Sequence, residues 1–188
     1  MGAWNGWYHV DGHTYGTWLP GDPRGWREKG HRKHVPGDYR KPPPRGFGDE
    51  VLKRSRDSLR HPPVRFTPPQ RETAGKSLVE MLISQQVEVI AASVDAVHYH
   101  ILARFPDTQV RPRVGRAKKH AWFSLREQEE IRRVWERLCN VTPVADRAHQ
   151  VRVYNYILEH AEKGAWTWSY KQGLHWTQDQ HVPDSAPK

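Results

Sequence analysis

Two strand-like segments, Glu88–Val94 and Val97–Phe105, follow each other with only Asp95 and Ala96 between them. A connection this short can join antiparallel strands, whereas parallel strands need a long crossover. The two segments are therefore expected to form a hairpin in an antiparallel sheet.

A helix with a complete start signal precedes this hairpin. Thr67 can cap the helix, Pro68 suits its first turn, and Gln70 completes a capping box. The apolar residues that follow have helical spacing: Ala74, Leu78, Met81 and Leu82.

Strand patterns also occur near both ends of the sequence. Trp7–Tyr15 and Ala165–Tyr170 contain the aromatic and β-branched residues that are typical of strands. Trp166 and Trp168 occupy alternate positions of the second segment, a pattern that usually indicates core packing.

The segments after the hairpin are less uniform. The basic stretch that begins at Arg111 is expected to enter a helix that runs to about Leu125. Arg132–Val141 combines apolar residues at helical spacing with strand-forming residues, and we expect a strand there.

The last helix is expected to have Thr142 as its N-cap, Pro143 at its first position and Gly164 as its stop signal. Its expected apolar stripe consists of Val151, Tyr154, Leu158 and Ala161. The resulting order of strands and helices predicts an α+β fold of the ferredoxin-like (RRM-like) type, an antiparallel sheet with helices packed on it.

One domain is expected over residues 1–170, followed by a C-terminal tail at 171–188. Within this domain, residues 21–69 form a long basic excursion with 13 Lys and Arg against 6 Asp and Glu, and a short helix is expected at Asp49–Leu59. Long loops in compact domains usually serve a function or are disordered.

The composition favours a basic protein with a small core. Hydrophobic residues make up 36% of the chain, the mean hydropathy is −0.90, and the net charge of +9 gives a pI near 9.8. Such a charge attracts polyanions, usually nucleic acid. No apolar run matches a membrane span or a signal peptide, and Cys139 is the only cysteine, so a cytoplasmic protein without disulfides or a cysteine-based zinc site is expected.

His98 and His100 are two residues apart in a strand-like run, so their side chains are expected on one face of the sheet. Two imidazoles placed in this way can bind one metal ion. Among 12 histidines such a pair arises by chance about once, so the motif needs support from a second element.

The last helix supplies that support. Tyr156 and His160 are four residues apart and share one helical face, with His149 seven residues before the tyrosine on roughly the same side. A metal ion beside a phenol is the minimum for phosphoryl transfer to protein, because the cation neutralises charge while the tyrosine oxygen attacks. A free tyrosine has a pKa near 10, and no dedicated base is evident.

In this order, the motifs VHYHILARF (97–105) and YILEH (156–160) resemble those of the single-tyrosine HUH transposases. This family includes the REP-associated tyrosine transposases and the transposases of insertion sequences that move as single strands. TYGTWLPGDPRGWR (14–27) is similar to the opening of one subgroup, and the resemblance covers about Tyr8 to Trp168.

The resemblance implies a metal-dependent single-stranded DNA endonuclease that cleaves and rejoins DNA through a covalent 5′-phosphotyrosine, often beside a hairpin. It implies that His98, His100 and His160 bind the metal and that Tyr156 is the nucleophile. Relatives mostly carry Gln, Asn or a carboxylate where this chain has His160. We expect Mn²⁺ or Mg²⁺ as the bound ion. Zn²⁺ and Co²⁺ are alternatives, because three imidazoles suit Mn²⁺, Co²⁺ or Zn²⁺ better than Mg²⁺. Tyr154 is a rival nucleophile, but it belongs to the expected apolar stripe.

Single-stranded DNA that contains a hairpin is therefore the expected partner, and a monomer or a homodimer is expected because both occur among relatives. Grooves for single strands combine basic charge with aromatic stacking platforms. The residues expected to contact DNA are Arg24, Trp26, Arg27, Arg111, Arg113, Arg116, Lys118 and Lys119.

Two alternatives remain open on the residues alone. One is a domesticated DNA-binding protein that no longer cuts. The other is a three-histidine zinc hydrolase with a water nucleophile, in which the position of Tyr156 is incidental.

Overall fold

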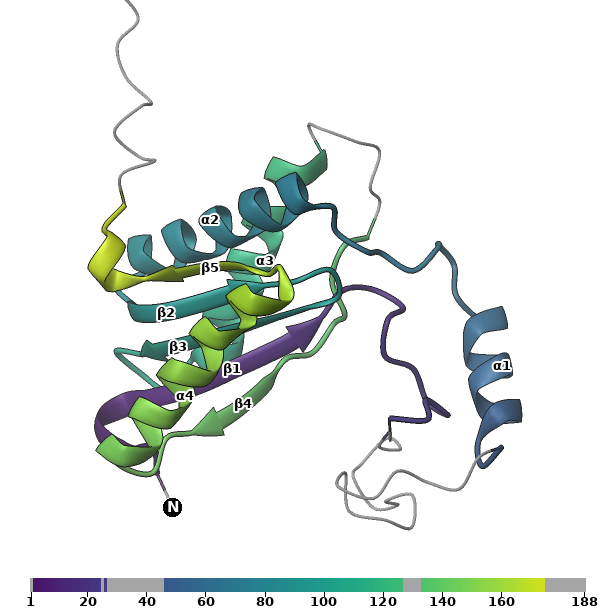
Figure 1. Ribbon diagram of the computed structural model, residues 1–188, viewed down its shortest axis with the longest axis horizontal. Helices are drawn as coiled ribbons and strands as arrows, with labels where there is room; N and C mark the ends of the chain where they lie inside the picture. Colours follow the sequence, from purple (N-terminus) through teal and green to yellow (C-terminus); the bar gives the residue numbers. More distant parts are fainter. Residues whose placement is uncertain (1, 25, 27–45, 127–132, 175–188) are drawn as a thin grey trace, which may run out of the picture.

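The computed structural model describes residues 2–24, 26, 46–126 and 133–174. They contain a five-stranded antiparallel sheet in the order β4-β1-β3-β2-β5, with helices on both faces (Figure 1). The strands are β1 (Trp7–His13), β2 (Glu88–Val94), β3 (His98–Arg104), β4 (Asn140–Pro143) and β5 (Trp166–Ser169). The α-helices are α1 (Asp49–Asp57), α2 (Pro68–Ser84), α3 (Val110–Arg126) and α4 (Arg147–Glu159). Short 3-10 turns are η1 (Trp4–Gly6), η2 (His160–Lys163) and η3 (Tyr170–Gln172).

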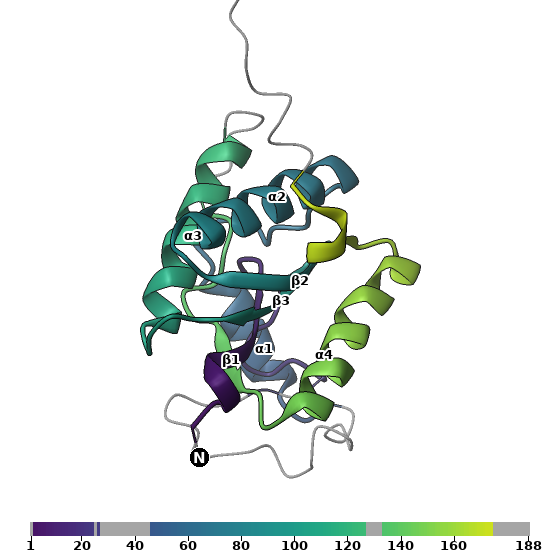
Figure 2. The same ribbon diagram turned by 90° about the vertical axis from the view of Figure 1, so that its left-hand side faces the viewer.

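The first four strands of the sheet, with α2 and α3, follow the β-α-β-β-α-β order of the ferredoxin-like fold. To this unit the chain adds α4, which contacts β2 and β3, and β5, which pairs with β2. Helix α4 lies on the opposite face of the sheet from α2 and α3 (Figure 2). The α+β antiparallel sheet predicted from the sequence is confirmed.

The sheet separates two cores of different size. The larger core lies between the sheet and helices α2 and α3 and includes the fully buried Leu78, Tyr99 and Ile101. The smaller core lies under α4 and contains Trp7, Ala91, Leu102, Val144, Val153 and Ile157. Because Leu102 is two residues from His100 on β3, the smaller core and His100 share one face of the sheet.

The structure confirms the helix start and the hairpin that the sequence predicts around residues 67–105. The capping box of Thr67 and Gln70 is formed at the start of α2. The turn between β2 and β3 is closed by Asp95, whose carboxylate accepts hydrogen bonds from the backbone amides of Val97 (2.6 Å) and His98 (2.7 Å). Helix α3 also lies where the sequence predicts a helix.

The strand expected at Arg132–Val141 is wrong over most of its length. Arg132 lies outside the described residues, and β4 covers only Asn140–Pro143. Trp135 forms a single bridge to Thr14, and its indole N–H donates to the carbonyl of Lys118 (3.0 Å). Backbone hydrogen bonds from Glu136 N to His13 O (3.0 Å) and from Tyr15 N to Val134 O (2.8 Å), together with packing in the larger core, therefore hold this segment without an extended strand.

The expected start of the last helix is also wrong. Thr142 and Pro143 pair with β1, so they belong to β4 rather than to the helix. The N-cap of α4 is Asp146, whose carboxylate accepts a hydrogen bond from the His149 amide (2.7 Å). The expected stop is confirmed, because η2, which directly follows α4, ends at Lys163 and has Gly164 (φ +78°) as its C-cap.

The apolar stripe expected on α4 faces a different direction in the structure. Val151 is 43% exposed and Ala161 is exposed, whereas the buried positions are Gln150, Val153, Ile157 and His160. Tyr154 and Leu158 lie at the margin of this face. The helix is therefore rotated relative to the expected stripe, and His160 points into the protein instead of lying beside the core.

The excursion expected at 21–69 lies partly outside the described residues, at 25 and 27–45. Its described part contains α1, where a short helix is expected from the sequence. Within the described ranges, no helix has both the length and the apolar sequence that a membrane crossing requires.

Gly75 of α2 leaves room for an indole ring on β5. Trp168 is 3% exposed, and Trp166 packs at the edge of the same core, as the alternating pattern predicts. A Cβ at Gly75 would lie 2.1 Å from an atom of the Trp166 ring, so the ring would have to move.

Gly75→Ala is therefore expected to destabilise the protein by about 1–3 kcal/mol through overpacking, in spite of the better helix propensity of alanine. Gly115→Ala in α3 is the matched control, because nothing lies within 4 Å of its Cβ position. This variant should be neutral or more stable. Urea unfolding of both variants checks the prediction, and equal stabilities would contradict it.

Candidate active site

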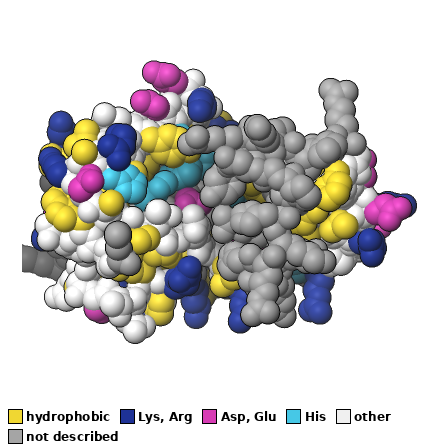
Figure 3. Space-filling view, turned by 90° about the horizontal axis from the view of Figure 1, so that it is seen from below, with side chains coloured by type: hydrophobic (Ala, Val, Ile, Leu, Met, Phe, Trp, Pro, Cys, Tyr) yellow, Lys and Arg dark blue, Asp and Glu magenta, His cyan; other side chains and the backbone are white. Residues whose placement is uncertain are grey.

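Strands β1 and β3 present a row of polar side chains on the face that α4 covers. In the antiparallel register Asp11 lies opposite His100, and His13 lies opposite His98. His9 is two residues before Asp11 and therefore shares this face. Figure 3 shows that histidine side chains gather in one patch of the molecular surface.

His98 and His100 of β3 and His160 of η2 converge. Each can offer one ring nitrogen so that the three nitrogens lie within 4.8 Å of one another. The ring centroids are 4.8 Å apart for His98 and His100, 4.9 Å for His100 and His160, and 5.5 Å for His98 and His160. The structure thus brings together the three residues that the sequence predicts as metal ligands, in a single chain.

Each of these three rings has a partner at Nδ1. His98 Nδ1 donates to the Asp95 carboxylate (2.7 Å), and His160 Nδ1 donates to the Tyr156 carbonyl (2.8 Å). His100 Nδ1 lies 3.1 Å from His9 Nε2. Metal-binding histidines commonly engage their second nitrogen in this way, which fixes the ring and its tautomer.

His100 Nε2 is buried and has no hydrogen-bond partner. A buried polar atom without a partner is costly, so the site favours a ligand there. Burial, followed by the neighbouring rings of His98, His9 and His160, lowers the pKa of His100 to about 2. The ring is therefore neutral at physiological pH, which is the form that binds a metal.

The carboxylate beside His98 is ionised. Burial acts to raise the pKa of Asp95, but hydrogen bonds from the His98 ring and from the backbone amides of Val97 and His98 lower it to about 2. The negative charge adjoins the back of the His98 ring and makes this imidazole a better electron donor.

Tyr156 lies at the mouth of the histidine cluster. Its side chain is 44% exposed, and its ring centroid is 4.7 Å from that of His160 and 5.3 Å from that of His100. Burial, then the charges of Asp11 and Asp95, raise the pKa of Tyr156. The phenol is therefore protonated at neutral pH, and the residue is partly open to solvent.

The rival tyrosine occupies a different part of the helix. Tyr154 is partly buried and lines a pocket with Trp7, Ile90 and Tyr170. None of the three clustered histidines lines that pocket. Position therefore favours Tyr156 over Tyr154 as the residue next to the cluster.

Sequence reasoning missed three neighbours of the cluster: His9, Asp11 and Asp95. His9, Asp11 and His13 alternate along β1, as His98 and His100 alternate along β3. This spacing is a signal for one shared face. Only the strand order, however, places β1 next to β3.

The cations expected to contact DNA fall into different environments. Arg111, Arg116 and Lys119 are exposed on α3, although Arg116 Nε donates to Gln85. Arg113 forms an ion pair with Asp107 and donates to the Gln85 carbonyl.

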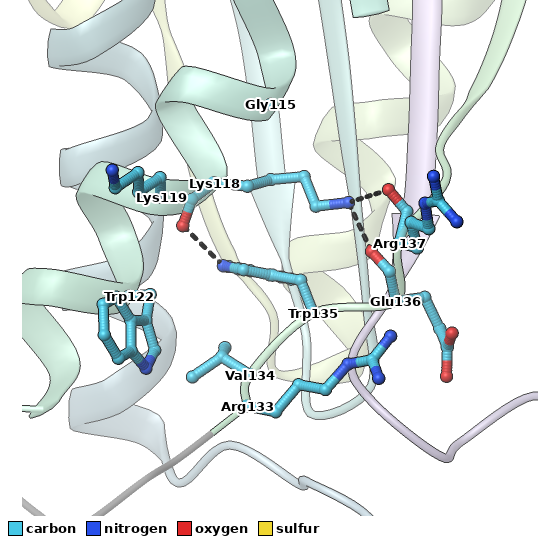
Figure 4. Close-up of a pocket in the computed structure, with 9 residues that line it drawn as sticks. All are labelled: Gly115, Lys118, Lys119, Trp122, Arg133, Val134, Trp135, Glu136 and Arg137. Carbon is cyan, nitrogen blue, oxygen red and sulfur yellow. Dashed lines mark hydrogen bonds between the residues drawn. The ribbon is translucent and has the colours of Figure 1, made fainter. Parts of the chain in front are cut away.

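Lys118 is not available to a phosphate in this structure. It is 7% exposed, and its ammonium group donates to the carbonyls of Glu136 (2.5 Å) and Arg137 (3.4 Å). Figure 4 shows this side chain reaching from α3 past the Trp135 ring toward Glu136 and Arg137, in a pocket on the α3 side of the sheet. Lys118 ties the 133–137 segment to α3.

The residues expected near the start of the excursion are only partly described. Arg24 forms an ion pair with Asp22 (2.6 Å) and lies over the Trp18 ring at 4.4 Å. Trp26 packs near Phe47, with 6.0 Å between ring centroids. Arg27 lies outside the described residues.

No family model and no curated protein matches the sequence. Among solved structures, the chain is similar to a REP-associated tyrosine transposase bound to a REP hairpin. The identity is 10%, the similarity covers 85% of this chain and 69% of that chain, and the TM-score is 0.49. Proteins that share a fold can differ in activity, so the function depends on the chemistry of the site itself.

Proposed function

We propose that this protein is a metal-dependent single-stranded DNA nuclease of the transposase type, which cuts through a covalent 5′-phosphotyrosine. The observation that carries the proposal is the position of Tyr156 at the mouth of three converging imidazoles. The motif order noted in the sequence, with the histidine pair before the tyrosine helix, supports the same assignment.

The residues present fit a divalent metal. His98 and His160 donate from Nδ1 and thus leave Nε2 free to bind an ion, while His100 Nε2 is buried without a partner. Three neutral nitrogen donors favour Mn²⁺, Co²⁺ or Zn²⁺ over Mg²⁺, which prefers oxygen. When bound, the ion would supply positive charge next to the scissile phosphate.

In the proposed reaction the Tyr156 oxygen attacks the phosphorus atom. A bond forms between this oxygen and phosphorus as the bond from phosphorus to the 3′ oxygen breaks. The products are a 5′-phosphotyrosine and a free 3′ hydroxyl, with the phenol proton released to solvent and the leaving oxygen protonated from it. Rejoining is the reverse attack by a 3′ hydroxyl on the phosphotyrosine.

Incubation of the protein with labelled single-stranded DNA and Mn²⁺, followed by denaturing electrophoresis, tests this proposal. A covalent protein–DNA band is expected, and chelation of the metal should remove it. Cleaved DNA without a covalent band would instead favour a three-histidine zinc hydrolase, a candidate that the same cluster supports. Binding without cleavage would indicate a DNA-binding protein that does not cut.

We also propose that exposed cations of α3 contact the DNA backbone. The triple variant Arg111→Ala, Arg116→Ala and Lys119→Ala should weaken the salt dependence of single-stranded DNA binding. Each lost phosphate contact should reduce the log–log slope by about 0.7, or about two units for all three. Fluorescence anisotropy at several salt concentrations measures the slope.

The loss of affinity should be similar for different DNA sequences, because phosphate contacts do not discriminate between bases. Glu80→Ala and Glu72→Ala on α2 provide charge-changing controls outside α3. An unchanged slope in the triple variant would mean that these cations are solvated and do not touch DNA.

A further inference from the structure

His9 of β1 is a direct neighbour of the histidine cluster. Its Nε2 lies 3.1 Å from His100 Nδ1, and the two ring centroids are 5.2 Å apart with an interplanar angle of 31°. The distance is that of a hydrogen bond between two ring nitrogens. One nitrogen must donate and the other must accept, so the pair has two arrangements.

The two arrangements have opposite consequences for His100. If His9 donated, neutral His100 would accept at Nδ1 and would carry its proton on Nε2, which could not then bind a metal. If His9 accepts, His100 keeps its proton on Nδ1 and presents the lone pair of Nε2. His100 Nε2 is the buried nitrogen without a partner.

The geometry points to His9 as a positioning residue that accepts the Nδ1 proton of His100 and thereby presents His100 Nε2 to the metal. This inference rests on the metal site of the proposed function. His9 accepts the Nδ1 proton of His100, just as Asp95 accepts that of His98 and the Tyr156 carbonyl accepts that of His160. Each of the three ligands then has an acceptor at Nδ1.

Two variants of His9 separate the hydrogen bond from simple packing. The side-chain oxygen of His9→Gln lies as many bonds from Cβ as Nε2 and can accept the same proton, whereas His9→Leu removes the acceptor. Loss of a partner of this kind typically lowers metal affinity by about 10–100-fold. Co²⁺ affinity and the visible absorption of the bound ion are therefore expected to fall in His9→Leu and to be largely rescued in His9→Gln.

His13→Gln is the matched control. His13 lies on the same face of β1, opposite His98, whose Nδ1 already has Asp95 as its partner. Its Co²⁺ affinity should equal that of the unaltered protein. Equal affinity in His9→Leu would overturn the inference. A change from two bound Co²⁺ ions per chain in the unaltered protein to one in His9→Leu would also overturn it. His9 would then bind a second ion together with Asp11 and His100.

A second measurement does not depend on whether His9→Leu folds. In the Zn²⁺-bound protein, ¹⁵N spectra of the histidine rings distinguish the two tautomers, and His9→Gln identifies the His9 signals. His9 is expected to carry its proton on Nδ1, and His100 on Nδ1 as well. A proton on His9 Nε2 would overturn the inference.

These outcomes are distinct from a failure of the proposed nuclease. If the protein binds Co²⁺ and His9→Leu weakens this binding, the role of His9 stands even when no DNA adduct forms. If the unaltered protein binds no Co²⁺, both the metal site and the role of His9 are wrong.

Discussion

Tyr156→Phe is expected to form no covalent protein–DNA adduct and to cleave no DNA, while it binds single-stranded DNA almost as well as the unaltered protein. The substitution removes only the attacking oxygen. The ring that packs against His100 and His160 remains. Since the side chain is 44% exposed, loss of the hydroxyl should cost little stability. Denaturing gels report the adduct, and anisotropy reports the affinity.

Tyr154→Phe is the matched control on the same helix. Tyr154 lines a pocket away from the histidine cluster, so this variant should cut and form adduct at the normal rate. Normal cleavage by Tyr156→Phe would contradict the assignment. If the adduct were instead lost in Tyr154→Phe, Tyr154 would be the nucleophile. Cleavage without any adduct would indicate that water is the nucleophile.

His98→Ala is expected to reduce cleavage by on the order of 10³-fold, because a bound metal contributes several kcal/mol and each 1.36 kcal/mol is a factor of ten. The variant removes one of three converging rings and the imidazole that pairs with Asp95, whose carboxylate keeps its two backbone hydrogen bonds. The expected loss should appear first in metal affinity, measured by Co²⁺ titration. Excess Mn²⁺ should restore part of the activity if weakened binding is the cause.

His120→Ala is the control for loss of a histidine. His120 belongs to α3, on the other face of the sheet, and should affect neither Co²⁺ affinity nor cleavage. Full metal affinity in His98→Ala would mean that the ion is held elsewhere, with His9, Asp11 and His100 as the other described group that could hold one.

The sequence by itself determined the features that depend on neighbours along the chain. The capping box at Thr67, the hairpin closed at Asp95 and the stop at Gly164 need only a few adjacent residues. The same holds for the sharing of a face by His98 and His100, which follows from strand geometry. Local spacing was also enough to predict that Tyr156 and His160 lie together on the last helix.

Only the tertiary structure decided how these local pieces meet. Pairing with β1 places Thr142 and Pro143 in a strand, which moves the start of α4 to Asp146. The rotation of α4 depends on how Val153 and Ile157 fit the face of the sheet, and this rotation buries His160. A helical pattern identifies apolar positions, but the opposing surface selects which of them are buried.

The same reason explains the residues that local patterns misplaced or missed. Lys118 belongs to a basic run, yet its ammonium group donates hydrogen bonds to two backbone carbonyls of the 133–137 segment. His9 is separated from His100 by 91 residues, and only the pairing of β1 with β3 brings their rings into hydrogen-bond distance. The sequence identified the three histidines of the candidate site, and contacts between distant strands supplied a neighbour, His9, that it did not identify.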